Sequence, residues 1–189
     1  MGRTYEELCK ASAEEIEEVM RQGRAPALES LAGWEFRGYN TGWANGIPGL
    51  PNFQTGLVVD VGGIRKFKKG FRPTPGDPTR LQGYNVKVEQ NGLENPWIEK
   101  LRGGESIKHG LFDVYPVRLS DPDHEYPNAV FLNYDCGRNA LWDPSRLLRD
   151  YLVCAGEGDD LLVGKGYGAI GSVRLHVGTF ILERHNPNV

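Results

Sequence analysis

The sequence predicts an all-β protein, a closed antiparallel barrel of about eight strands preceded by an N-terminal α-helix. Glycine and proline account for 25 and 12 of the 189 residues, and from position 42 onward they recur roughly every 8 to 15 residues. This spacing of turn formers predicts many short strands. The intervening segments are too short for the helices that a parallel α/β fold requires. We expect one domain over 1–189, with the helix in 1–25 and the barrel in 33–185.

Helical signals are concentrated at the N-terminus. Thr4 and Glu7 have the spacing of a capping box, and Gly23 is a stop signal. Between them, apolar residues recur near one helical face, at Leu8, Ile16, Val19 and Met20. A second, short helical turn is predicted where Asp143 can cap and Pro144 suits the first helical position.

The strand candidates are short stretches bounded by turn residues. They span residues 34–42, 55–60, 64–72, 81–90, 111–120, 129–135, 151–155, 160–169 and 174–184. The stretches 43–55 and 73–80 are predicted as long loops. Closing the strands into a barrel removes the unpaired edges of the sheet. A barrel of about eight strands is just wide enough to hold one small ligand.

The candidate strand with the densest positive charge also carries two phenylalanines. Phe67 and Phe71 have the same parity, whereas Lys66, Lys68 and Arg72 have the opposite one. We therefore expect the phenylalanines to be buried and the three cations to face solvent. A nucleic-acid site would place aromatic rings and cations on one accessible face. Together with a net charge of −3, the pattern gives no reason to expect a nucleic-acid partner.

Other motifs do not indicate a cofactor or a metal. Residues 166–171 match GxGxxG, but a strand-like segment follows them, so a tight hairpin is favoured over a dinucleotide site. The four histidines lack the spacing of a zinc site. The carboxylates of 121–125 lack the glycine of a calcium loop. We expect neither a metal nor a cofactor.

The cysteines favour a reducing compartment. Cys9, Cys136 and Cys154 are odd in number and lack CxxC spacing, and the first residues contain no apolar signal region. We expect three unbridged thiols and a cytoplasmic protein. The sequence contains no apolar run near the ~20 residues of a membrane helix, so no membrane partner is expected. The oligomeric state is left open.

A tryptophan and an arginine at the two ends of the barrel segment resemble a known family. Gly33-Trp34 opens the first strand after a helical segment, and Arg184 ends the last strand. The pair is similar to that of the calycin superfamily of lipocalin-like barrels, although Ala32 departs from the family's fuller Gly-x-Trp pattern. The resemblance implies that Trp34 and Arg184 form a cation–π contact at the closed end of the barrel.

Strand parity then assigns candidate interior residues. Phe36 and Asn40 share the parity of the first-strand tryptophan, and Phe180 and His176 share that of the last-strand arginine. His176 lies eight residues from that arginine and so falls toward the opposite end of the barrel. The other candidate ligand contacts are Trp43, Tyr84 and Tyr134.

These expectations favour an intracellular barrel whose apolar, aromatic-lined pocket binds a small hydrophobic molecule. The alternative is a cofactor-free isomerase or cyclase of small-molecule biosynthesis, because such chemistry needs only a shaped cavity and one acid or base. His176 and His109 are the candidate catalytic residues. A weaker alternative is a haem-binding barrel with His176 as the iron ligand.

Overall fold

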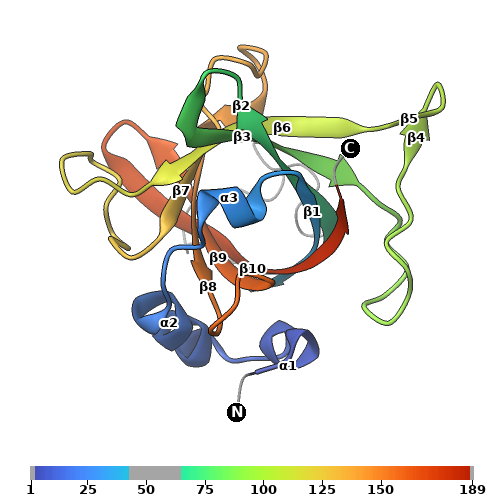
Figure 1. The fold of residues 1–189 in the computed structure, drawn as a ribbon, viewed down its shortest axis with the longest axis horizontal. Helices are drawn as coiled ribbons and strands as arrows, with labels where there is room; N and C mark the ends of the chain where they lie inside the picture. Colours follow the sequence, from blue (N-terminus) through green and yellow to red (C-terminus); the bar gives the residue numbers. More distant parts are fainter. Residues whose placement is uncertain (1–2, 43–64, 188–189) are drawn as a thin grey trace, which may run out of the picture.

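The structure, a computed structural model, describes residues 3–42 and 65–187. Within them, eight strands close into an antiparallel barrel in the order β1-β10-β9-β8-β7-β6-β3-β2 (Figure 1). The predicted fold class is confirmed. The barrel strands are β1 (Trp34–Gly42), β2 (Lys66–Thr74), β3 (Asp77–Lys87), β6 (Lys108–Pro116), β7 (Val130–Asn133), β8 (Leu148–Cys154), β9 (Leu161–Ile170) and β10 (Val173–Pro187).

Short elements complete the described chain. They are the hairpin of β4 (Leu101–Arg102) with β5 (Glu105–Ser106), and the 3-10 helix η1 (Pro144–Leu147). The Asp143 side chain accepts a hydrogen bond from the backbone N–H of Ser145, which confirms the predicted helical turn. The candidate strand 55–60 and the candidate loop 43–55 lie outside the described residues.

The N-terminal segment is helical, as predicted, but it forms two helices. They are α1 (Tyr5–Cys9) and α2 (Ala13–Gln22). Thr4 caps α1 as expected. The hydroxyl of Ser12 accepts a hydrogen bond from the backbone N–H of Glu15 at 3.2 Å and starts α2 with a second capping box. That second box divides what the apolar spacing predicted as one helix.

The two helices pack against the outside of the barrel, beside β8, β9 and β10 (Figure 1). A buried apolar cluster joins them to the wall. Its members include Leu8, Ile16 and Met20 from the helices and Val153, Val163 and Ile181 from the strands. These strands are therefore covered on both faces, and a second apolar cluster lies in the barrel interior.

A third helix, α3 (Leu28–Leu31), lies across one end of the barrel (Figure 1). Leu31 is fully buried in the interior cluster. The Arg184 guanidinium lies 4.7 Å from the ring centroid of Trp34 and donates a hydrogen bond to the carbonyl oxygen of Ser30 at 2.8 Å. The predicted contact between Trp34 and Arg184 is confirmed. We call this end the closed end, and the opposite end, where β3 ends and β6 and β8 begin, the far end.

The parity predicted for β2 is correct, but the predicted exposure is wrong for two lysines. Phe67 and Phe71 belong to the interior cluster, and Arg72 is exposed. Lys66 and Lys68 lie on the outer face, yet only 1 % and 3 % of them is exposed. Solvent exposure was expected because a strand's outer face usually meets water.

The segment that follows β3 covers that outer face. Lys66 Nζ lies 4.0 Å from the ring centroid of Trp97 and donates a hydrogen bond to the carbonyl oxygen of Gly92 at 2.8 Å. Lys68 Nζ forms an ion pair with Glu99 at 2.5 Å. Both ammonium groups are thus buried with partners, as buried charges must be.

Of two predictions about turns and loops, one is wrong and one is correct. Residues 73–80 do not form a long loop, because β2 and β3 are joined by a tight turn in which Gly76 has a φ of 76°. The GxGxxG stretch belongs to a hairpin, as predicted. Its last glycine, Gly171, has a φ of 58° and turns the chain from β9 into β10.

Three interior phenylalanines each lie over a glycine directly across the neighbouring strand. The pairs are Gly38 with Phe67, Gly83 with Phe112, and Gly164 with Phe180. A Cβ atom at the three glycines would lie 2.5, 2.0 and 2.2 Å from the ring. Glycine at these positions therefore lets each ring rest against the barrel wall, the arrangement by which aromatic side chains cover strand glycines.

All three cysteines, Cys9, Cys136 and Cys154, are free, as predicted. Burial raises the pKa of Cys9 and of Cys154 to about 12, so both are protonated thiols at neutral pH.

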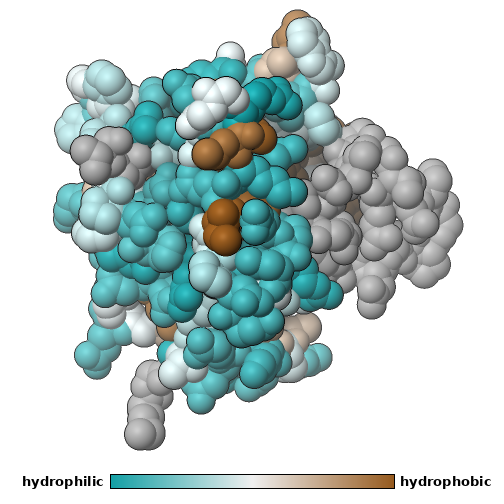
Figure 2. Space-filling view, turned by 90° about the vertical axis from the view of Figure 1, so that its right-hand side faces the viewer, coloured by the Kyte–Doolittle hydropathy of each residue, from teal (hydrophilic) through white to brown (hydrophobic). Residues whose placement is uncertain are grey.

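The face in Figure 2 is mainly hydrophilic, with separate hydrophobic spots. Across the described chain, none of the helices has both the length and the apolar character needed to cross a membrane.

The ring-over-glycine packing predicts the outcome of a single methyl insertion. Gly164→Ala should lower the free energy of unfolding by about 1–3 kcal/mol, because the added methyl group would force the ring of Phe180 away from the barrel wall. Urea denaturation measures the loss. Gly156→Ala is the matched control, since its Cβ atom would have no neighbour within 4 Å. Equal stabilities for the two variants would contradict the packing described.

Candidate functional site

Four polar side chains are buried together in the barrel interior. Lys69, Asn85, Tyr134 and Asp150 are 3 %, 8 %, 2 % and 4 % exposed. They come from β2, β3, the residue after β7, and β8. Lys69 points inward because it lies between the two inward phenylalanines of β2. We call these four residues the Lys69 cluster.

Hydrogen bonds and one ion pair connect the cluster. The Lys69 ammonium donates to Asn85 Oδ1 at 2.9 Å and to the Tyr134 hydroxyl at 2.5 Å. That hydroxyl donates to Asp150 Oδ2 at 3.1 Å. The same carboxylate oxygen lies 3.6 Å from Lys69 Nζ. The ammonium therefore has a neutral acceptor, a phenol and a counter-charge around it.

Aromatic rings surround the rest of the ammonium. Its nitrogen lies 5.5 Å from the ring centroid of Phe67, 4.8 Å from Phe112 and 5.0 Å from Phe180. The ring of Tyr134 is 5.2 Å away. Such contacts stabilise a cation more strongly when water is absent. The three phenylalanines are the ones that rest on glycines, so the glycine pattern shapes the surroundings of the charge.

A β-bulge orients Asn85. Gly110 and Leu111 of β6 together oppose the single residue Tyr84 of β3. Gly110 has a φ of 52°, a conformation that glycine adopts most readily. Its carbonyl oxygen accepts a hydrogen bond from Asn85 Nδ2 at 3.1 Å. This bond fixes the amide so that its oxygen faces Lys69.

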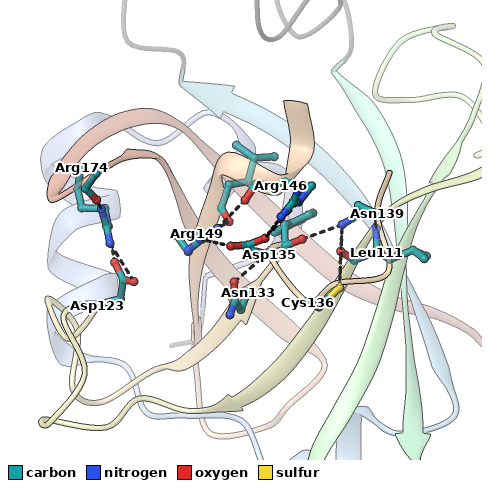
Figure 3. Close-up of polar contacts among 12 residues, drawn as sticks. Leu111, Asp123, Asn133, Asp135, Cys136, Asn139, Arg146, Arg149 and Arg174 are labelled. Carbon is teal, nitrogen blue, oxygen red and sulfur yellow. Dashed lines mark hydrogen bonds and ion pairs between the residues drawn. The ribbon is translucent and has the colours of Figure 1, made fainter. Parts of the chain in front are cut away.

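Side-chain contacts fix the turn that carries Tyr134 (Figure 3). Asn139 Nδ2 donates to the carbonyl oxygens of Tyr134 and Leu111, both at 2.7 Å. Asn139 Oδ1 accepts from the backbone N–H of Leu111 at 2.8 Å. Arg146 binds the carboxylate of Asp135 at 2.7 Å. The chain after β7 is thus tied to β6 and to η1.

Burial shifts the proton affinities of the cluster. Desolvation lowers the pKa of Lys69 to about 8, although the Asp150 carboxylate opposes the shift. Desolvation raises the pKa of Asp150 and that of Tyr134, because both would carry a negative charge in an apolar interior. At pH 7 roughly one tenth of a lysine with such a pKa is the neutral amine.

Three of the candidate ligand contacts lie in the barrel interior. Phe36, Tyr134 and Phe180 are buried in the interior cluster. Phe36 lies in the closed half, whereas Tyr134 and Phe180 adjoin Lys69. Asn40 is half-buried and pairs with Phe180. Trp43 lies outside the described residues. That these residues bind a ligand stays a prediction.

Two further candidates are not members of the Lys69 cluster. Tyr84 points to the outer face, where its hydroxyl donates a hydrogen bond to Glu35 Oε1 at 3.0 Å. The residues immediately before and after it in β3 are the ones that point inward. His109 is exposed at the start of β6 and lies across from Asn85. The catalytic role assigned to His109 stays a prediction.

The interior position expected for His176 is wrong. The pairing of β10 with β9 shifts between His176 and Gly178, so Val177 is an extra residue that reverses the parity. His176 faces Tyr167 of the outer cluster, with ring centroids 5.6 Å apart. An iron-bound haem inside the barrel would need an inward histidine, and His176 does not supply it.

The sequence analysis did not identify Lys69, Asn85 or Asp150. The alternation that places Phe67 and Phe71 inside also places Lys69 inside, so the signal was present. Asp150 was missed because the strand was predicted to begin at 151, whereas β8 begins at Leu148.

Comparison of the chain with models of protein families, with curated proteins and with solved structures gave no match. Across residues 3–42 and 65–187, no group of three or more His, Cys, Asp or Glu side chains could hold a metal ion. We therefore infer the chemistry of this interior from the Lys69 cluster itself.

A double-mutant cycle tests the ion pair. Lys69→Met leaves the Asp150 carboxylate buried without its counter-charge, which should lower the free energy of unfolding by about 3–5 kcal/mol at neutral pH. The double variant Lys69→Met/Asp150→Asn should lose much less than the sum of the single losses. Urea denaturation of the four proteins gives the coupling.

The cycle also has an expected pH dependence. Asp150 has a raised pKa in the folded protein, and removing Lys69 raises it further. The deficit of Lys69→Met should therefore shrink as the pH falls and the carboxylate is protonated. Additive losses, or a deficit that grows in acid, would contradict the pairing.

Proposed function

We propose that the protein binds a small hydrophobic molecule in the barrel interior, with the molecule's polar atom at the Lys69 cluster. The observation that carries this proposal is a cation, a carboxylate, a phenol and an amide buried together among aromatic rings. Apolar residues of similar size usually stabilise an interior as well as or better than a buried ion pair. Converging polar groups with shifted pKa values in an apolar site are typical of ligand binding.

The charge balance of the cluster favours a neutral ligand. Asp150 already compensates the charge of Lys69, so a carboxylate would bring an unpaired charge into the interior. A carbonyl or hydroxyl oxygen can instead accept a hydrogen bond from the ammonium at little electrostatic cost. We infer a ligand with an apolar body and one neutral oxygen.

The wider assignment is also a proposal. A closed barrel with the Trp34–Arg184 contact at its closed end supports a calycin-like, lipocalin-like architecture. The three free cysteines support a cytoplasmic location. Both inferences agree with a barrel that takes up one small molecule at its far end.

A second candidate is a cofactor-free isomerase or cyclase. It is supported by the hydrogen-bonded series Lys69, Tyr134 and Asp150, because these groups can pass a proton between them. In this version the acid–base residues are those of the cluster and not His176. Turnover of a bound carbonyl compound would separate the enzyme from a plain binding barrel.

The neutral fluorescent ketone prodan tests the binding proposal. Prodan should bind the purified full chain with a blue-shifted emission. Lys69→Met should weaken binding by about 10- to 100-fold, as expected when a hydrogen bond from a charged donor is lost. Lys100→Met, which removes an exposed lysine, is the matched control and should bind normally.

Two results would count against this function. Prodan affinity that is unchanged in Lys69→Met would place the ligand elsewhere. Tighter binding of an anionic naphthalene sulfonate than of prodan would contradict the inference of a neutral ligand. Native mass spectrometry of the freshly purified protein can identify a natural ligand.

A further inference from the structure

We propose that Lys69 is a nucleophile that forms an imine with the carbonyl group of a hydrophobic aldehyde or ketone. This inference rests on the proposed binding function and assigns a chemical class to its ligand. It depends on the position of a primary amine at the centre of the barrel interior. The same amine is within hydrogen-bonding distance of a phenol that contacts a carboxylate.

The reaction is a condensation that needs no oxidant or reductant. The neutral Nζ attacks the carbonyl carbon, and the electron pair of the C=O bond moves to oxygen, which takes a proton. The nitrogen loses its protons, the C–O bond breaks, and the oxygen leaves as water. The carbonyl compound and the amine thus give an imine and one water molecule.

Tyr134 is placed to handle the protons of this condensation. Its hydroxyl is 2.5 Å from Nζ, where the carbonyl oxygen of a reacting ligand must also lie. It can donate a proton to that oxygen and later regain one. Its hydrogen bond to Asp150 at 3.1 Å holds the hydroxyl in place. A proton donor within such reach is the geometric requirement for general acid catalysis.

The site also suits the product. When the imine nitrogen takes up a proton, the positive charge lies on the same nitrogen as it did in the ammonium. The Asp150 carboxylate and the rings of Phe67, Phe112 and Phe180 already surround that atom. The interactions that stabilise the free lysine therefore stabilise the adduct, and the apolar body of the ligand excludes water from it.

The amine is reactive at moderate pH. With a pKa of about 8, the neutral fraction of Lys69 at pH 7 exceeds that of an ordinary lysine by a factor on the order of 10². The ionisable groups in contact with it are Asp150 from β8 and Tyr134 after β7, and its charge also helps to lower the pKa of His109 at the start of β6. Adduct formation should rise with pH up to about 8 and then level off.

Reductive trapping tests the inference. The full chain is incubated with cinnamaldehyde and sodium cyanoborohydride, and the product is examined by intact mass and peptide mapping. We expect a single adduct at Lys69 that forms much faster than modification of exposed lysines. Tyr134→Phe should slow the reaction by roughly 10²–10⁴ if the hydroxyl transfers the proton, with the adduct still at Lys69.

Controls make every outcome decisive. Lys100→Met should react as the wild type does, and Lys69→Met should lack the fast adduct, with circular dichroism confirming that it is folded. If Lys69→Met does not fold, the peptide map of the wild type decides by itself. Modification spread over exposed lysines, or a rate that rises steadily beyond pH 9 as for an ordinary lysine, would overturn the inference.

Cinnamyl alcohol separates this inference from the binding function, because it has the same body but cannot form an imine. If the alcohol binds in a Lys69-dependent way and the aldehyde gives no adduct, the imine is wrong and the binding function stands. If neither compound binds and no adduct forms, both are overturned.

Discussion

The interior of this barrel depends on the cost of removing one ammonium group from water. A charge buried as deeply as that of Lys69 persists only with compensation, and the surrounding structure supplies it from several strands. Asp150 provides the counter-charge, and Asn85 and Tyr134 provide hydrogen bonds. Three aromatic rings supply the remaining contacts. Many local features of the chain follow from this requirement.

The placement of the groups around Lys69 depends on backbone positions where only glycine fits. Gly38, Gly83 and Gly164 allow the rings to rest against the wall, which leaves the centre of the barrel to the lysine side chain. Gly110 adopts a positive φ and offers its carbonyl oxygen to Asn85. The abundance of glycine, which first indicated short strands and turns, thus has a second cause in the packing of the interior.

Sequence reasoning was reliable where periodicity decides and unreliable where one residue changes the register. The barrel and the inward phenylalanines follow from turn spacing and alternation, whereas the Trp34–Arg184 contact was expected only from a resemblance to a known family. His176 was misplaced because the bulge at Val177 has no clear sequence signal in a glycine-rich hairpin. Lys66 was misjudged because its cover comes from the distant segment around Trp97. Lys69 could have been predicted by applying the alternation to every residue of its strand.

The arrangement of the two halves of the interior fixes how a ligand would lie. The closed half is filled by side chains such as Leu31, Phe36 and Phe71, so no apolar group can pass beyond the Lys69 cluster. A ligand from the far end would therefore enter with its polar oxygen first and leave its apolar body toward that end. Along this path β9 presents Gly166 and Gly168, whose missing side chains leave Val177 and Asp150 as the nearest groups. The bulge that turns His176 outward thus brings an apolar side chain inward, which matches the wall to the apolar body of the proposed ligand.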